Sequence, residues 1–104
     1  MKHILIQWTY FADIVSVPDR IADNLRDYQI SFDKWIGDKN NKHKYWVRVN
    51  PDDQGYIDGL CFGSDAFVCW LNDFIIKENE QKAYFIKEHI KPNMIQKKLP
   101  TIYF

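Results

Sequence analysis

The chain has 104 residues, the usual size of one domain, with 46% hydrophobic and 27% charged residues. This composition excludes disordered, collagen-like and membrane-spanning chains. Fourteen Lys and Arg residues balance fourteen Asp and Glu residues, so no global positive charge indicates a nucleic-acid-binding protein. We expect a single domain over residues 1–104, with residues 92–104 forming a C-terminal tail or a final strand.

The N-terminal residues predict a strand followed by a helix. Residues 3–11 alternate in polarity with a period of two, which is typical of a strand. Ser16, Pro18 and Asp19 then follow in the order of an N-cap, an early proline and an acid in the first turn. We therefore expect the first helix to begin just after Ser16.

The first helix is predicted from apolar residues that recur at steps of three and four over residues 21–36, and Gly37 is a suitable end for it. Ile30 projects away from this apolar stripe. The alternative to one long helix is therefore a break near residue 28 with a restart at Ser31.

The middle of the chain predicts a β-hairpin. Residues 43–50 and 56–62 both alternate as strands do, and the polar segment 51–55 between them is typical of a turn. Gly59 weakens the second strand.

A second helix is predicted from Ser64, as its N-cap, with Asp65 in its first turn. Residues 82–87 alternate again and predict a further strand. The apolar residues that we expect to face the core from this helix are Phe67, Trp70, Leu71, Phe74 and Ile75.

The order of these elements is β-α-β-β-α-β, with loops short enough for hairpins. This order favours an α+β fold. We expect a mostly antiparallel sheet of about four to five strands with two helices packed on one face.

The two cysteines, Cys61 and Cys69, match neither a disulfide framework nor a compact zinc spacing. We interpret them as reduced thiols, one of them buried, in a protein of the cytoplasm. No cleavage site of small residues follows the N-terminal apolar run, which argues against a signal peptide.

The sequence offers few groups for catalysis. The three histidines share no metal-ligand spacing, and the four glycines form no phosphate-binding loop. We expect no catalytic, cofactor-binding or metal-binding residues, and a protein that is not an enzyme. The enzymatic alternative is a site assembled in space from His43, Asp58 and Cys61.

Acidic residues form the most informative pattern. On the first predicted helix Asp19, Asp23 and Asp27 recur every four residues, and on the second Asp65 and Asp73 share the outward side. Like charges on one helix face repel each other. A cationic protein partner would compensate this repulsion and would be steered toward the acids. A solvated acidic face, screened by salt, is the alternative interpretation.

Two isoleucines, Ile30 and Ile76, are predicted to point outward among these acids, where they would suit apolar anchors in an interface. The turn between the hairpin strands adds two more carboxylates. The candidate partner-binding residues are Asp19, Asp23, Asp27, Ile30, Asp52, Asp53, Asp65, Asp73 and Ile76.

The segment 39–48 has the opposite character, because it interleaves lysines and one arginine with aromatic residues. Such a pattern can bind nucleic acid. A small nucleic-acid-binding or phage regulatory protein is therefore the alternative function, although solvated lysines on strand faces explain the pattern as well.

Two C-terminal segments carry a resemblance. Asp65–Ile76 (DAFVCWLNDFII) and Lys82–Pro92 (KAYFIKEHIKP) resemble small bacterial immunity proteins of contact-dependent growth inhibition and other polymorphic toxin systems. The resemblance implies a cytosolic antidote that binds a cognate toxin domain, often a nuclease, which is commonly basic because its substrate is a polyanion. We therefore expect a non-enzymatic immunity protein with a protein partner, no membrane and no nucleic acid; the pattern sets no oligomeric state.

Overall fold

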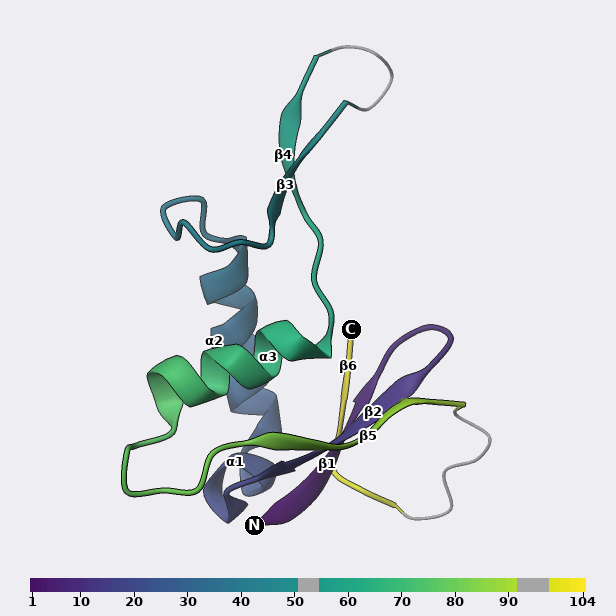
Figure 1. The fold of residues 1–104 in the computed structure, drawn as a ribbon, viewed down its shortest axis with the longest axis vertical. Coiled ribbons are helices and arrows are strands. Elements are labelled where there is room, and N and C mark those ends of the chain that lie inside the picture. Colours follow the sequence, from purple (N-terminus) through teal and green to yellow (C-terminus); the bar gives the residue numbers. More distant parts are fainter. Residues whose placement is uncertain (51–54, 92–97) are drawn as a thin grey trace.

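A four-stranded sheet forms one layer of the computed structural model, which describes residues 1–50, 55–91 and 98–104 (Figure 1). Its strand order is β5-β2-β1-β6. The pairs β1–β2 and β2–β5 are antiparallel, whereas β6 runs parallel to β1. The α+β class and the mostly antiparallel sheet are confirmed. The strands are β1 (Lys2–Gln7), β2 (Ala12–Val17), β5 (Tyr84–Ile90) and β6 (Thr101–Tyr103).

The predicted helix start at Ser16 was wrong, because residues 12–17 form strand β2. The chain turns sharply after β1, where the amide of Trp8 donates to the carbonyl of Phe11 at 2.8 Å, and it returns as a second strand. Ser16 is a buried residue of β2 and caps no helix. The β-branched residues of this segment favour a strand, and Pro18 holds the residue before it in an extended conformation.

Two helices, α1 (Asp19–Asp23) and α2 (Leu25–Gly37), replace the single predicted helix. The break lies at Asn24 and not near residue 28, and α2 runs without interruption through Ile30 to its predicted end. The side-chain Nδ2 of Asn24 donates to the carbonyl of Arg20 at 2.9 Å. Asparagine side chains compete in this way with helical hydrogen bonding, which explains the break.

The third helix, α3 (Ser64–Trp70), continues into a π-helix, η2 (Leu71–Ile75), that the sequence pattern did not indicate. The amide of Ile76 donates to the carbonyl of Leu71 at 2.7 Å, five residues earlier. This wider turn changes the rotation per residue. Two predictions for the helix faces were therefore wrong: Phe74 is 63% exposed, and Ile76 is only 5% exposed.

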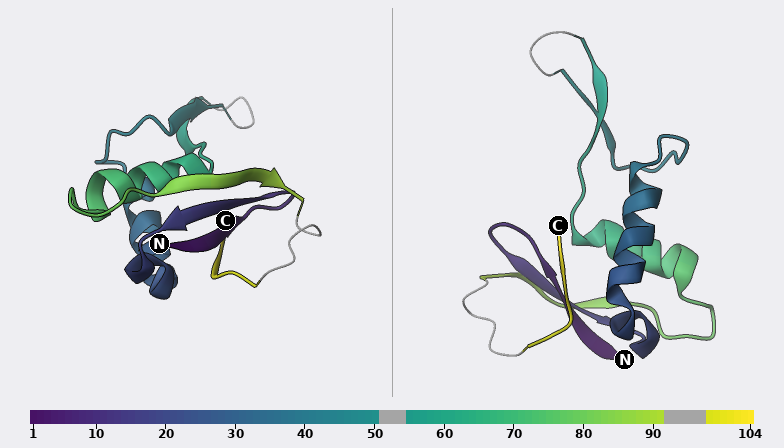
Figure 2. Two further views of the ribbon diagram at one scale, coloured as in Figure 1. Left: turned by 60° about the horizontal axis from the view of Figure 1, so that its bottom comes forward. Right: turned by 180° about the vertical axis from the view of Figure 1, so that it is seen from behind.

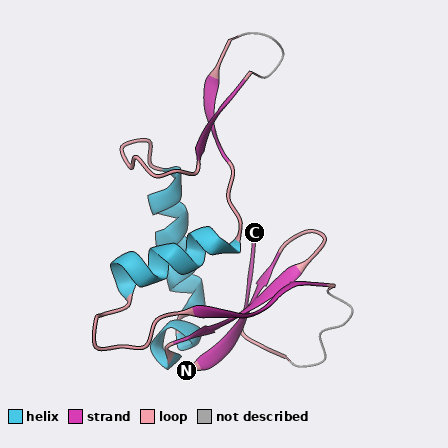
Figure 3. Ribbon diagram, in the orientation of Figure 1, coloured by secondary structure: helices cyan, strands magenta, loops and turns pink. Residues whose placement is uncertain are grey.

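The predicted hairpin is confirmed with shorter strands, but it forms a separate two-stranded sheet instead of joining the first one. Strands β3 (Trp46–Val49) and β4 (Ile57–Leu60) are antiparallel, with Trp46 opposite Leu60. The hairpin extends away from the helices and the larger sheet (Figures 2 and 3). Residues 51–54 of the predicted turn lie outside the described residues.

The remaining C-terminal predictions are confirmed in part. The strand predicted over residues 82–87 is β5, which begins at Tyr84 and ends at Ile90, and β6 is the final strand that was one of the two alternatives for the C-terminal segment. Residues 92–97 lie outside the described part of the chain.

The buried core is formed by residues of β1, β2 and β6 together with residues of α1, α2, α3 and η2, but the helices do not form the clear layer on one face that the sequence predicted. Phe32 of α2 is fully buried at its centre, with ring centroids 5.3 to 5.7 Å from those of Phe62, Phe67, Trp70 and Phe104. Edge-to-face contacts of this kind add specific geometry to apolar burial. Aromatic residues make up 16% of the sequence, and this cluster shows that many of them serve the core.

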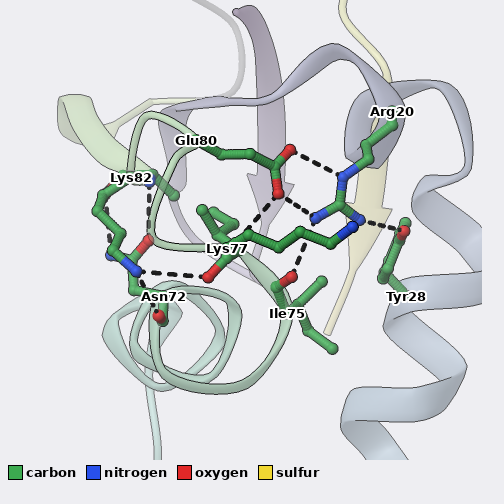
Figure 4. Close-up of polar contacts among 9 residues, drawn as sticks. Arg20, Tyr28, Asn72, Ile75, Lys77, Glu80 and Lys82 are labelled. Carbon is green, nitrogen blue, oxygen red and sulfur yellow. Dashed lines mark hydrogen bonds and ion pairs between the residues drawn. The ribbon is translucent and has the colours of Figure 1, made fainter.

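Arg20 links α1 to the end of η2 and to the loop before β5 (Figure 4). Its guanidinium donates to both carboxylate oxygens of Glu80, at 2.9 and 2.6 Å, and to the Tyr28 hydroxyl and the Ile75 carbonyl, both at 2.9 Å. The hydrogen bonds from Arg20 and from the Lys77 amide lower the pKa of Glu80 to about 2. This cluster fixes η2 against α1 and α2.

Candidate functional site

The acids of the first two helices are partly neutralised within the chain. Asp19 lies 3.0 Å from the amino group of Met1, and Asp23 lies 2.6 Å from the Lys2 ammonium. Both cations, on residues 1 and 2, therefore lie beside α1, which the sequence pattern did not indicate. Asp27 is exposed, and no cationic side chain among the described residues pairs with it. The predicted repulsive stripe is therefore reduced to one free carboxylate.

The acids of the third helical segment are exposed as predicted. Neither Asp65 nor Asp73 pairs with a cation in the part of the chain that the structure describes, and both lie close enough to Tyr45 to raise its pKa. Ile30 is exposed as predicted, but the anchor role of Ile76 loses its basis because that residue is buried. Asp52 and Asp53 lie outside the described residues.

One face of the β3–β4 hairpin is apolar and exposed. Residues directly opposite each other share a face, so Val47 and Gly59 lie on the same side as Val49 and Ile57. All three apolar side chains are exposed, Ile57 by 57%. Gly59 leaves room for them, because a Cβ there would lie 3.4 Å from a methyl group of Val49. The sequence reading treated these residues only as strand formers and missed this surface.

A cavity of about 340 Å³ lies at the root of this hairpin, where the chain leaves α2 and enters β3. We call it the root cavity. Aromatic rings follow one another along it: Phe74 lies 5.5 Å from Trp35, Trp35 lies 4.8 Å from His43, and His43 lies 5.5 Å from Tyr45, between centroids. The lining is completed by Lys44, Ala66, Cys69, Trp70 and Asp73.

Tyr45 is the unusual residue of the root cavity. It is 8% exposed, and its hydroxyl, which is itself buried, makes no hydrogen bond of normal geometry within the described residues, although Cys69 lies close to it. Burial, followed by the nearby Cys69 and the carboxylate of Asp65, raises the pKa of Tyr45 to about 12. A buried hydroxyl without a partner is costly, so this residue weakens the packing at the root of the hairpin.

His43 separates the root cavity from a second cavity of about 210 Å³, which Lys39, Lys42, Trp46 and Asp58 also line. Both ring nitrogens of His43 lie against backbone groups: Nε2 is 2.9 Å from the Ile36 carbonyl oxygen, and Nδ1 accepts from the Tyr45 amide at 3.2 Å. Trp46 stacks on this ring at a centroid distance of 5.3 Å.

The trio weighed for catalysis is only partly assembled. His43 and Asp58 line the second cavity, but Cys61 does not. Both Cys61 and Cys69 are free thiols and exposed, so the expectation that one is buried was wrong. Cys69 is exposed on α3, where it lines the root cavity, and Cys61 follows β4 directly before Phe62, which packs against the core.

A buried polar cluster joins the larger sheet to α3. The Ser64 hydroxyl donates to Asp13 and accepts from the Trp8 indole nitrogen at 2.8 Å, while the amide of His89 donates to Asp13 at 2.9 Å. His89 has a φ of 54°, at an irregularity in the pairing of β5 with β2. Ser64 therefore holds α3 against the sheet instead of capping it. Only the polarity of Asp13 within an apolar strand could have indicated this cluster.

The wider comparisons add no assignment. No protein-family model matches the chain, and neither a curated protein nor a solved structure matches it. Within the described residues, no group of three or more His, Cys, Asp or Glu side chains is placed to hold a metal ion. None of the helices in that part of the chain has both the length and the apolar character needed to cross a bilayer.

Proposed function

We propose that this protein works by binding another protein, and that the partner is a toxin domain which it neutralises as a non-enzymatic immunity protein. The observation that carries the proposal is the exposed apolar face of the β3–β4 hairpin. An isolated two-stranded hairpin is marginal in water, and exposed apolar surface of this kind is typical of interaction sites. A partner that covers Val47, Val49 and Ile57 would stabilise the hairpin and the complex together.

Charge supports a basic partner. Asp27, Asp65 and Asp73 are exposed carboxylates without a cationic partner among the described side chains. Such carboxylates accelerate association with a positively charged protein and disfavour acidic ones. A nuclease domain, whose surface attracts a polyanion, has the required charge.

The direct test is a growth assay in a naive bacterium. The C-terminal region, roughly 250 residues or one to two domains, of the protein encoded immediately upstream is expressed with and without this chain. We expect toxicity that this chain relieves. Toxicity without relief, or no toxicity, would contradict the proposal.

A variant pair assigns the effect to the hairpin. Ile57→Asp places a charge in the apolar face and should abolish protection, because the interface would have to bury an unpaired carboxylate. Tyr10→Asp is the matched control, since Tyr10 is 86% exposed and lies in the turn between β1 and β2. Full protection by folded Ile57→Asp would exclude the hairpin as the binding surface.

A second candidate function rests on the second cavity. Lys39 and Lys42 line it beside Trp46, and a cation next to a large ring suits a nucleotide phosphate and base. Nucleic-acid binding predicts retention on heparin or DNA that weakens steeply as salt rises. Passage of the protein through both columns at low salt would exclude it.

A further inference from the structure

The root cavity has an aromatic lining, a size and an opening to the surface that suit an organic cation. Four of its lining residues are aromatic, Trp35, Tyr45, Trp70 and Phe74, and they come from α2, the segment before β3, α3 and η2. Aromatic rings attract cations through the negative potential of their faces. The cavity volume of about 340 Å³ is at the lower end of the range for ligand sites. Phe74, exposed by the π-helical turn, extends this wall to the surface.

The charges around the cavity favour a positive group. Asp73 belongs to the lining, and Asp65 lies near enough to Tyr45 to influence its hydroxyl. The chain itself already places a cation here, because the Lys44 ammonium lies 5.5 Å from the centroid of the Tyr45 ring. Lys44 is exposed, whereas Tyr45 and Trp70 are held by the core.

We propose that the root cavity holds the guanidinium group of an arginine side chain presented by the protein partner. The inference rests on the proposed function for the existence of that partner, but its chemistry can be tested without it. The cavity adjoins the hairpin through Tyr45, whose carbonyl accepts from the Cys61 amide at 3.0 Å. One partner can therefore cover the apolar face and insert a side chain into the cavity.

Arginine fits the cavity better than lysine does. A guanidinium is planar, stacks on aromatic faces and is more weakly hydrated than an ammonium group. It also has five donors, several of which can bind the exposed Asp73 carboxylate in the lining.

The experiment uses the whole chain and three small probes. Nα-acetyl-argininamide is titrated while the four tryptophan indole resonances are followed by NMR, with the neutral isostere Nα-acetyl-citrullinamide and with Nα-acetyl-lysinamide as comparisons. We expect argininamide to shift the Trp35 and Trp70 signals in a saturable way. The Trp8 signal is the internal control, because its indole is bonded to Ser64 in another part of the fold.

Three exposed positions test the mechanism with little risk to folding. Asp73→Asn should weaken argininamide binding roughly two- to fivefold, as should Phe74→Ala, because each removes one exposed attractive contact. Lys44→Gln should strengthen binding by about the same factor, because it removes a competing cation.

Each other outcome overturns the proposal. No saturable shift at Trp35 and Trp70 would exclude a cation site, equal binding of citrullinamide would indicate an apolar occupant, and preference for lysinamide would exclude arginine. Unchanged affinity in Asp73→Asn and Lys44→Gln would remove the electrostatic argument. If argininamide binds but the growth assay fails, the immunity function alone is contradicted. If the double variant Asp73→Asn with Phe74→Ala still protects the bacterium, the arginine site alone is contradicted.

Discussion

The two sheets of this protein differ in what they do with apolar side chains. In the larger sheet Ile4, Ile6 and Ile102 are buried against the helices, whereas all eight residues of β3 and β4 are exposed or half-buried. Burial of apolar surface is the main source of stability. We infer that the larger sheet and its helices stabilise the fold and that the hairpin keeps its apolar surface for a partner.

The largest expected effect on stability comes from removing a buried side chain of the core. Phe32→Ala should lower the free energy of unfolding by about 3–5 kcal/mol, because it removes a fully buried ring and leaves a cavity. Val49→Ala, in the hairpin, should change it by less than about 1 kcal/mol. Urea titration followed by circular dichroism measures both, and similar losses would show that the hairpin belongs to the cooperative core.

Hydrogen exchange compares the local stability of the two sheets without mutation. The amides of β1 and β2 should exchange only on global unfolding, while those of β3 and β4 should exchange through local opening, at least about a hundredfold faster. Site-resolved exchange by NMR tests this. Equal protection of the two sheets would contradict the separation of roles.

Charge reversal probes the surface rather than the fold. Asp27→Lys combined with Asp65→Lys should slow association with the toxin domain by about threefold to tenfold at low salt, because both positions are exposed carboxylates. Asp19→Lys is the control, since Asp19 already pairs with the N-terminal amine. Stopped-flow association rates at two salt concentrations measure the effect, and equal rates for all variants would exclude electrostatic steering.

The smallest expected effect concerns pH. The pKa of Glu80 is lowered from 4.5 to about 2 by Arg20, so its ionised form stabilises the folded state. This contribution is complete above pH 4.5 and is lost as the pH falls toward 2. Wild type should therefore lose more stability than Glu80→Gln between pH 5 and pH 2. Thermal unfolding across that range is the measurement, and parallel curves would show that the ion pair is screened.

Much of the fold was predictable because local signals dominate there. The hairpin alternation, the end of α2 at Gly37 and the start of α3 near Ser64 all follow from neighbouring residues. Strand β2 was missed because Ser16, Pro18 and Asp19 also form a plausible helix start. The π-helix depends on an extra residue within a turn, which an apolar pattern with a step of three or four does not indicate.

The site was less predictable because it is assembled from distant segments. The sequence pattern identified exposed Asp65 and Asp73, but it gave no sign that Asp19 and Asp23 would find cations at the N-terminus. The root cavity brings together side chains from residues 35, 45 and 70–74. Its unpartnered Tyr45 hydroxyl arises only from that packing.

The parallel pairing of β6 with β1 has a consequence for the order of assembly. Residues 101–103 lie beside residues 5–7, and the Phe104 amide donates to the Gln7 carbonyl at 3.0 Å. Closing a loop of nearly the whole chain is entropically expensive and slows folding. The β1–β2 hairpin can form early from local contacts, whereas the edge strand beside it joins late. We therefore expect the pairing of β6 with β1 to be the slowest step of refolding.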